Sequence, residues 1–138
     1  MSYSLGLWQA MLATVYVADK VRLGAHEFVP TSRIADDLDI PAPSLSRLLR
    51  SLNHAGIIET REGASGGVRL AVPADEVTLL DLLEAVEQKL PLFRTDAEPR
   101  VRGETPKMRQ AALKGALADA EASMRSSLRE VTVADISK

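Results

Sequence analysis

Cysteine is absent from the 138 residues of this chain, and its absence excludes several kinds of chemistry. Without thiolates there can be no disulfide, no cysteine nucleophile, no thiolate zinc site and no cysteine-ligated iron–sulfur cluster. The chain has only two histidines, and neither lies among other residues at metal-ligand spacing. We therefore expect no metal and no cofactor.

The signatures of common enzymes are also missing. No glycine-rich loop opens a helix after a strand, and no nucleophile elbow is present. Asp36, Asp37 and Asp39 lie close together, but in a short predicted helix and its turn, where acids are more often solvated than catalytic. We expect no catalytic residue, and the chain is predicted not to be an enzyme.

Long apolar runs are absent, since no stretch approaches the ~18 apolar residues of a membrane span. The N-terminus shows neither a charged n-region nor a signal cleavage site. These features favour a cytoplasmic protein without a membrane partner. The net charge of −2 gives no basic signature overall, so any binding to DNA must rest on local charge.

The clearest pattern that is present lies between residues 41 and 71. Apolar residues recur there at three- and four-residue spacing, namely Leu45, Leu48, Leu49, Leu52 and Ala55. This spacing predicts a helix with one apolar face, and its other faces carry serine, arginine and asparagine without any acid. Gly56 is expected to end the helix, because glycine adopts the left-handed conformation at little steric cost.

Two short strands, 57–61 and 68–71, follow this helix, and the segment 62–67 with its three glycines predicts a hairpin turn between them. A short helix over 32–38, with Thr31 as its expected N-cap, comes before it. Two short helices followed by a hairpin indicate a mainly α fold with a small β-hairpin wing, a winged helix-turn-helix.

Local charge favours double-stranded DNA as the partner of this unit. Residues 31–71 hold five arginines and five acids, but 40–58 contain Arg47, Arg50 and His54 without an acid. In a helix-turn-helix the second helix enters the major groove, where such side chains meet phosphates and base edges. The predicted DNA-binding residues are Thr31, Ser32, Ser44, Ser46, Arg47, Arg50, Arg61 and Arg69.

Apolar residues at helical spacing also predict a helix over 5–23. They are Leu5, Trp8, Met11, Leu12, Val15, Tyr16, Ala18 and Val21. Trp8 is expected to fill the core or a dimer seam rather than to contact a ligand.

The chain divides into three predicted segments: a winged helix-turn-helix domain over 1–87, a loop over 88–106, and a dimerisation helix with its tail over 107–138. The last helix carries one apolar stripe, formed by Leu113, Leu117, Ala120, Met124 and Leu128. The stripe either completes the protomer's own core or crosses a partner helix. We favour the homodimer, because the helix is long and follows an irregular loop.

The chain resembles the Rrf2 family of winged-helix transcription regulators. The resemblance runs through Ala55-Gly56-Ile57, through 66–71 (GGVRLA) and through 78–87 (TLLDLLEAVE), and it covers nearly the whole chain. It implies a homodimer joined by the last helix, two winged helices on a pseudo-palindromic site, and control of transcription, usually repression. It also implies an effector, either a small molecule or a protein.

Two departures from the family pattern narrow this expectation. Family members that sense iron or nitric oxide carry three cysteines in the loop equivalent to 88–106, and this chain has none, so the resemblance implies the cluster-free branch. The family's wing often has Arg-Gly before the Gly-Gly pair, where this chain has Glu62-Gly63. An acid there repels phosphate. A winged-helix module that binds protein instead of DNA is therefore the alternative.

Overall fold

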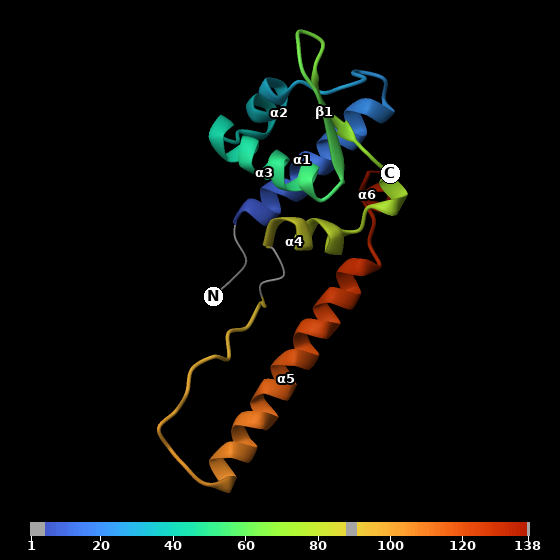
Figure 1. Ribbon diagram of the computed structural model, residues 1–138. Helices are drawn as coiled ribbons and strands as arrows, with labels where there is room; N and C mark the ends of the chain where they lie inside the picture. The colour runs from blue at the N-terminus through green and yellow to red at the C-terminus, as the bar shows by residue number, and fades with distance from the viewer. Residues whose placement is uncertain (1–4, 88–90, 138) are drawn as a thin grey trace.

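The computed structural model describes residues 5–87 and 91–137, and Figure 1 shows a winged-helix body from which one long helix extends. The elements in chain order are α1 (Leu5–Arg22), α2 (Thr31–Leu38), α3 (Ala42–His54), β1 (Ile58–Arg61), β2 (Gly67–Leu70), the 3-10 turn η1 (Ala74–Glu76), α4 (Leu79–Glu87), α5 (Glu104–Arg129) and α6 (Val133–Ile136). This confirms the predicted fold class. The parts of the three predicted segments at 1–4, 88–90 and 138 lie outside the described residues.

Helix α1 lies at the centre of the core and packs against α2, α3, α4, α6 and β2. Its buried face consists of small side chains, namely Ala10, Ala13, Thr14, Val17 and Ala18. The predicted face was therefore wrong in part, because Leu5 and Trp8 are 69% and 59% exposed. Small residues let several elements approach α1 closely. The face of α1 that is buried is therefore the one with small side chains and not the one with the largest apolar side chains. The core alternative for Trp8 is excluded within this protomer.

The turn between α2 and α3 depends on one unusual backbone conformation. Asp39 adopts a left-handed conformation with φ of 52°, which Asp tolerates better than most residues. The N–H of Ile40 then donates to the carbonyl of Ala35 at 3.1 Å, and α3 begins after Pro41. The N-cap of α2 is Pro30 and not Thr31, so the helix begins one residue earlier than predicted.

Helix α3 ends in a Schellman motif, as the position of Gly56 predicted. Gly56 has φ of 79° and donates its N–H to the carbonyl of Asn53 at 3.0 Å. The N–H of Ile57 donates to the carbonyl of Leu52, also at 3.0 Å, and both of these side chains are buried. This pairing of hydrogen bonds and apolar contact fixes where the chain leaves α3 for the wing.

Gly56→Ala is expected to lower the free energy of unfolding by about 1 kcal/mol, because an L-residue in the left-handed conformation is strained. A Cβ at position 56 would meet no neighbour, so conformation alone accounts for this cost. Gly115→Ala is the matched control, since Gly115 lies inside α5 in open space and alanine favours a helix by about 1 kcal/mol. Urea unfolding should show a lower free energy of unfolding for Gly56→Ala and a higher one for Gly115→Ala, each relative to the wild type. A change of the same sign in both variants would contradict the left-handed conformation assigned to Gly56.

The wing is a two-stranded antiparallel sheet in which Thr60 pairs with Val68 and Glu59 pairs with Arg69. The backbone of Val29 adds a bridge to its outer edge, since Val29 and Val68 exchange N–H···O bonds of 2.8 and 2.9 Å. Gly67 makes this approach possible. A Cβ at Gly67 would lie 2.1 Å from the carbonyl oxygen of Val29. The wing is thus attached to the segment that enters α2.

Two capping boxes of the same kind lie where the long helix meets the body. Thr78 exchanges hydrogen bonds with Asp81 at the start of α4, and Thr132 does the same with Asp135 at the start of α6. Thr78 and Thr132 also form a β-bridge with each other. These contacts hold the C-terminal end of α5 against the body.

Helix α5 itself has 26 residues, and none of them is buried. It begins at Glu104, slightly before the predicted boundary, and runs away from the winged-helix body (Figure 1). The stripe on α5 therefore does not complete the protomer's core. Among the helices within 5–87 and 91–137, none has both the length and the apolar character required to cross a membrane.

Candidate nucleic-acid interface

The outer surface of α3 is the first part of the candidate interface. Its buried side holds the four predicted leucines, Leu45, Leu48, Leu49 and Leu52. By helical periodicity, Arg47, Arg50 and His54 lie on the opposite side, which faces solvent. Ser46 is exposed beside them, whereas Ser44 is only half exposed. The apolar spacing thus positions both arginines away from the core.

A shallow groove joins α3 to the wing and to the start of α2. Its volume is about 320 Å³, and among the residues that line it are Thr31, Ser46, Arg50, Asn53 and Thr60. The structure thus brings three predicted residues together. Asn53 and Thr60 were not predicted. The spacing could have indicated Asn53, which lies one turn beyond Arg50 on the same side of α3.

A second groove, of about 500 Å³, continues the first between the start of α2 and the wing. Thr31 and Ser32 line one side of it, and Arg61, Glu62 and Gly63 line the other. The hydroxyls of Thr31 and Ser32 lie at a helix N-terminus, where the backbone N–H groups and the helix dipole favour an anion. Glu62 places a carboxylate opposite them. The groove therefore offers phosphate a helix N-terminus on one side and charges of both signs on the other.

Arg47 and Arg50 differ from the other arginines of the winged helix in being unpaired. Across residues 5–87 and 91–137, no acid lies within salt-bridge distance of either guanidinium. Arg33 pairs with Asp37 at 3.1 Å, and Arg61 pairs with Glu27. A free guanidinium can meet a phosphate or a base without first losing a partner. The charge available to DNA is thus concentrated on α3.

The two predicted wing arginines are Arg61, which also lines the groove with Thr31 and Ser32, and Arg69, which does not. Arg61 and Arg69 stack on the ring of Phe28, at 4.1 and 4.4 Å from its centroid. Both also pair with Glu27, at 3.6 and 3.4 Å, and Arg69 pairs with Glu59 across the strands. The structure does not bring them together with Arg47 and Arg50. Any phosphate would compete with these acids for the wing arginines.

A three-residue cluster braces α2 against α1. The Tyr16 hydroxyl and the Arg33 guanidinium both donate to the carboxylate of Asp37. The hydrogen bond from Tyr16, followed by that from Arg33, holds the pKa of Asp37 below its usual range. Burial and then the bond to Asp37 raise the pKa of Tyr16. Asp37 thus stays ionised near neutral pH and fixes the helix that supports α3.

The predicted dimerisation residues lie along the extended part of α5. Leu113 is 66% exposed, Ala120 is exposed, and Leu117, Met124 and Leu128 are half buried. The part of the loop that follows residue 90 lies beside α5, where the N–H of Leu92 donates to Glu121. Arg125 links Glu121 to Glu84 of α4. This side of α5 is thus connected to its own protomer, while Leu113 remains uncovered.

Comparison with known proteins gives a consistent result. Residues 7–138 match the family model described as "Rrf2: Iron-dependent Transcriptional regulator". The chain is 34% identical over 88 residues to the HTH-type transcriptional regulator IscR of Cereibacter sphaeroides, covering 64% of this chain and 56% of that protein. It is 30% identical over 112 residues to the regulator NsrR of Shouchella clausii, covering 80% and 73%. The match thus spans little more than half of the IscR relative's length.

Among solved structures, the oxidised form of Staphylococcus aureus CymR superposes with a TM-score of 0.75. The superposition covers 100% of this chain and 97% of that one, at 21% sequence identity. The IscR structure of T. potens superposes with a TM-score of 0.65 at 20% identity. At such low identities these likenesses concern the fold.

The family description mentions iron, and the residues of this chain do not fit an iron centre. The sequence supplies no cysteine. Within 5–87 and 91–137, no three His, Asp or Glu side chains gather where they could hold a metal ion. Iron–sulfur clusters need thiolates, and other iron sites need several nitrogen or oxygen ligands from the protein. The described residues therefore offer no ligand set for iron.

Proposed function

Because the chain belongs to the Rrf2 family, whose members are transcriptional regulators and not enzymes, we propose that it is a sequence-specific DNA-binding repressor. It acts as a homodimer in the cytoplasm and works without an iron–sulfur cluster. One observation carries the DNA-binding part: Arg47 and Arg50 lie unpaired on the outer side of a helix that the core and the Asp37 cluster hold in place.

In this proposal α3 reads the major groove and the other elements position it. Arg47 and Arg50 contact base edges or phosphates, and Ser44, Ser46 and Asn53 supply shorter polar contacts from the same helix. Thr31 and Ser32 bind a phosphate at the start of α2. The wing contributes weaker backbone contacts, because Glu62 faces the groove and the arginines at 61 and 69 already have acidic partners.

Arg47→Ala and Arg50→Ala, made singly, are each expected to weaken binding to the preferred operator by about 10- to 100-fold, since a base contact contributes about 1–3 kcal/mol of discrimination. The operator is first obtained by selecting bound genomic fragments. Fluorescence anisotropy at one fixed salt concentration then gives Kd for the operator and for a scrambled duplex. The loss of affinity for the operator should exceed the loss of affinity for the scrambled duplex.

Arg61→Ala is the matched comparison, because Arg61 is an arginine of the same domain that already pairs with Glu27. Its effect should be smaller and similar on both duplexes. An equal loss on both duplexes for Arg50→Ala would restrict that residue to phosphate contact. Unchanged affinity for both α3 variants would remove α3 as the reading helix.

A protein-binding module is the second candidate function, and the wing is the observation that favours it. Glu27 and Glu59 pair with the wing arginines, and Glu62 adds an acid to the groove beside the start of α2. A gel shift on the gene's own upstream region, at low and moderate salt, separates the two candidates. If apo protein and protein with metabolite mixtures both lack a sequence-preferring shift, the protein-binding module is favoured.

A further inference from the structure

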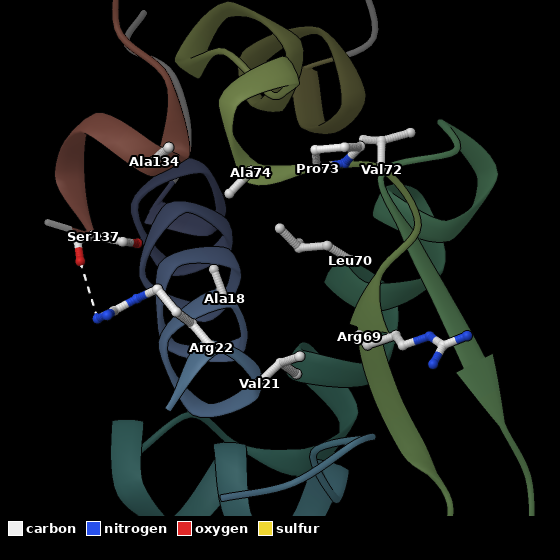
Figure 2. Close-up of a pocket in the computed structure, with 10 residues that line it drawn as sticks. All are labelled: Ala18, Val21, Arg22, Arg69, Leu70, Val72, Pro73, Ala74, Ala134 and Ser137. Carbon is white, nitrogen blue, oxygen red and sulfur yellow. Dashed lines mark hydrogen bonds between the residues drawn. The ribbon is translucent and has the colours of Figure 1, made fainter. Parts of the chain in front are cut away.

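A cavity of about 460 Å³ lies at the base of the wing, on the side of the hairpin away from α3's outer surface. Figure 2 shows it between α1, the C-terminal part of β2 with the link that follows, and α6. Its size falls within the range of small-molecule sites, about 300–1,000 Å³. Arg69 lines it, but the residues of α2 and α3 that are proposed to contact DNA do not.

Apolar side chains form most of the cavity wall. Leu70 points into it from β2, and the remaining wall includes Ala18, Val21, Pro73, Ala74 and Ala134. Three of these residues are alanines, contributed by α1, η1 and α6, and their short side chains leave the space open. Such a wall favours an apolar body over a sugar or a nucleotide.

One end of the cavity is polar and not fully satisfied. The Arg22 guanidinium donates to the carbonyl oxygen of Ser137 at 3.2 Å (Figure 2). The Ser137 hydroxyl is buried and has no hydrogen-bond partner among the described residues. Buried hydroxyls nearly always have a partner in folded proteins, so this one indicates a ligand atom or a water. A cation and an unused donor thus lie side by side.

The charges around the cavity disfavour a ligand with more than one negative charge. Arg69 also lines the cavity, but its guanidinium points away and pairs with Glu59 and Glu27. Arg22 has one acidic neighbour, Asp19, at 3.4 Å. A monoanion would share Arg22 with Asp19, whereas a phosphate dianion would leave a larger uncompensated negative charge there. A planar carboxylate also matches the geometry of a guanidinium.

We propose that this cavity binds a small monocarboxylate with an apolar body. The carboxylate accepts hydrogen bonds from Arg22 and from the Ser137 hydroxyl, and the apolar body lies against Leu70, Val21 and the three alanines.

Occupancy of the cavity also changes DNA affinity, and this part rests on the proposed function. Leu70 belongs to the same strand as Val68 and Gly67, which attach the wing to Val29 and to the start of α2. A ligand held between α1, α6 and β2 restrains that strand. The cavity is therefore an effector site of the regulator.

Binding is tested on the full chain without DNA, by calorimetric titration with hexanoate and phenylacetate and, in parallel, with their neutral amides. At least one acid should bind saturably, with Kd on the order of 1 mM as expected for about ten heavy atoms. Its amide should bind at least about tenfold more weakly. Absence of saturable binding by both acids, or equal binding of acid and amide, would overturn the proposal.

Three variants locate the site. Arg22→Gln should weaken binding of the acid at least fivefold, and Ala74→Leu should weaken it by filling the cavity. Arg94→Gln is the matched control, because Arg94 is also an exposed arginine beside a local acid, Asp96, but does not line the cavity. Circular dichroism checks that each variant folds. Unchanged binding in both Arg22→Gln and Ala74→Leu would place the ligand elsewhere and contradict the assignment.

The effect on DNA is measured separately, by operator titration with and without saturating acid. A change of at least threefold in Kd is expected. Saturable binding of the acid with an unchanged operator Kd would refute the effector role while leaving the site. Loss of operator binding altogether would count against the proposed function and leave the calorimetric result intact.

Discussion

Leu113→Asp combined with Leu117→Asp is expected to convert the proposed dimer into monomers and to lower operator affinity by about 100-fold or more. Two linked winged helices bind two half-sites as one unit, and linkage of this kind is worth about 10²–10⁴ in affinity. Aspartate on both residues would bring like charges and their desolvation cost into the seam. Light scattering at micromolar concentration and anisotropy on the full operator measure the two effects.

Ala118→Asp combined with Ala122→Asp is the control, since it adds the same charge at the same four-residue spacing to exposed positions on the side of α5 away from the stripe. This control should stay dimeric. Leu113→Asp alone gives a second check, because a side chain that is 66% exposed contributes little to the protomer's own stability. A wild-type chain that is monomeric at micromolar concentration, or a double leucine variant that remains dimeric, would rule out the seam on α5.

Gly67→Ala is expected to lower the free energy of unfolding by about 3 kcal/mol or more, or to displace the wing. Its φ of 146° is rarely adopted by residues with a side chain, and a strained backbone of this kind costs about 1–3 kcal/mol. The added Cβ would also lie 2.1 Å from the Val29 carbonyl oxygen and 2.8 Å from the nitrogen of Pro30. These are backbone atoms, so relief requires the wing to move away from the start of α2.

Gly63→Ala separates the two contributions to this cost. Gly63 has φ of 100°, but a Cβ there would meet no neighbour, so only conformational strain remains. In thermal unfolding, the melting temperature of Gly67→Ala should be well below that of Gly63→Ala, and that of Gly63→Ala should be below that of the wild type. Equal melting temperatures for the two variants would show that the contact with Val29 contributes nothing.

The apolar spacing of α3 was enough to predict the candidate reading helix from sequence. Four leucines on one side of α3 must face the core, which fixes the orientation of the helix. The absence of acids on the opposite side then indicates that this side is the one that binds DNA. Gly56 also gave the end of this helix correctly, because a Schellman motif needs only local residues. The capping threonine at 78 was predictable for the same reason.

Features that depend on packing between distant residues were not predictable in this way. The sequence pattern predicts that large apolar residues are buried. The buried face of α1 instead contains Ala10 and Ala13, because several elements must approach that helix closely. The wing arginines were assigned by their charge alone. Their actual partners, Phe28 and Glu27, lie more than 30 residues earlier in the chain, and spacing carries no signal for such contacts.

The bridge between Thr78 and Thr132 holds one end of α5 at the body, so a small rotation there displaces the far end of the helix by several ångströms. A helix of 26 residues is about 39 Å long, so a rotation of about 5° at the bridge moves its far end by about 3 Å. In a dimer held along that helix, the same rotation changes the separation between two reading helices. Operator half-sites must lie in phase with the turn of the double helix. In the proposed dimer, the backbone bridge between Thr78 and Thr132 would therefore control the spacing of the two half-sites without contacting DNA.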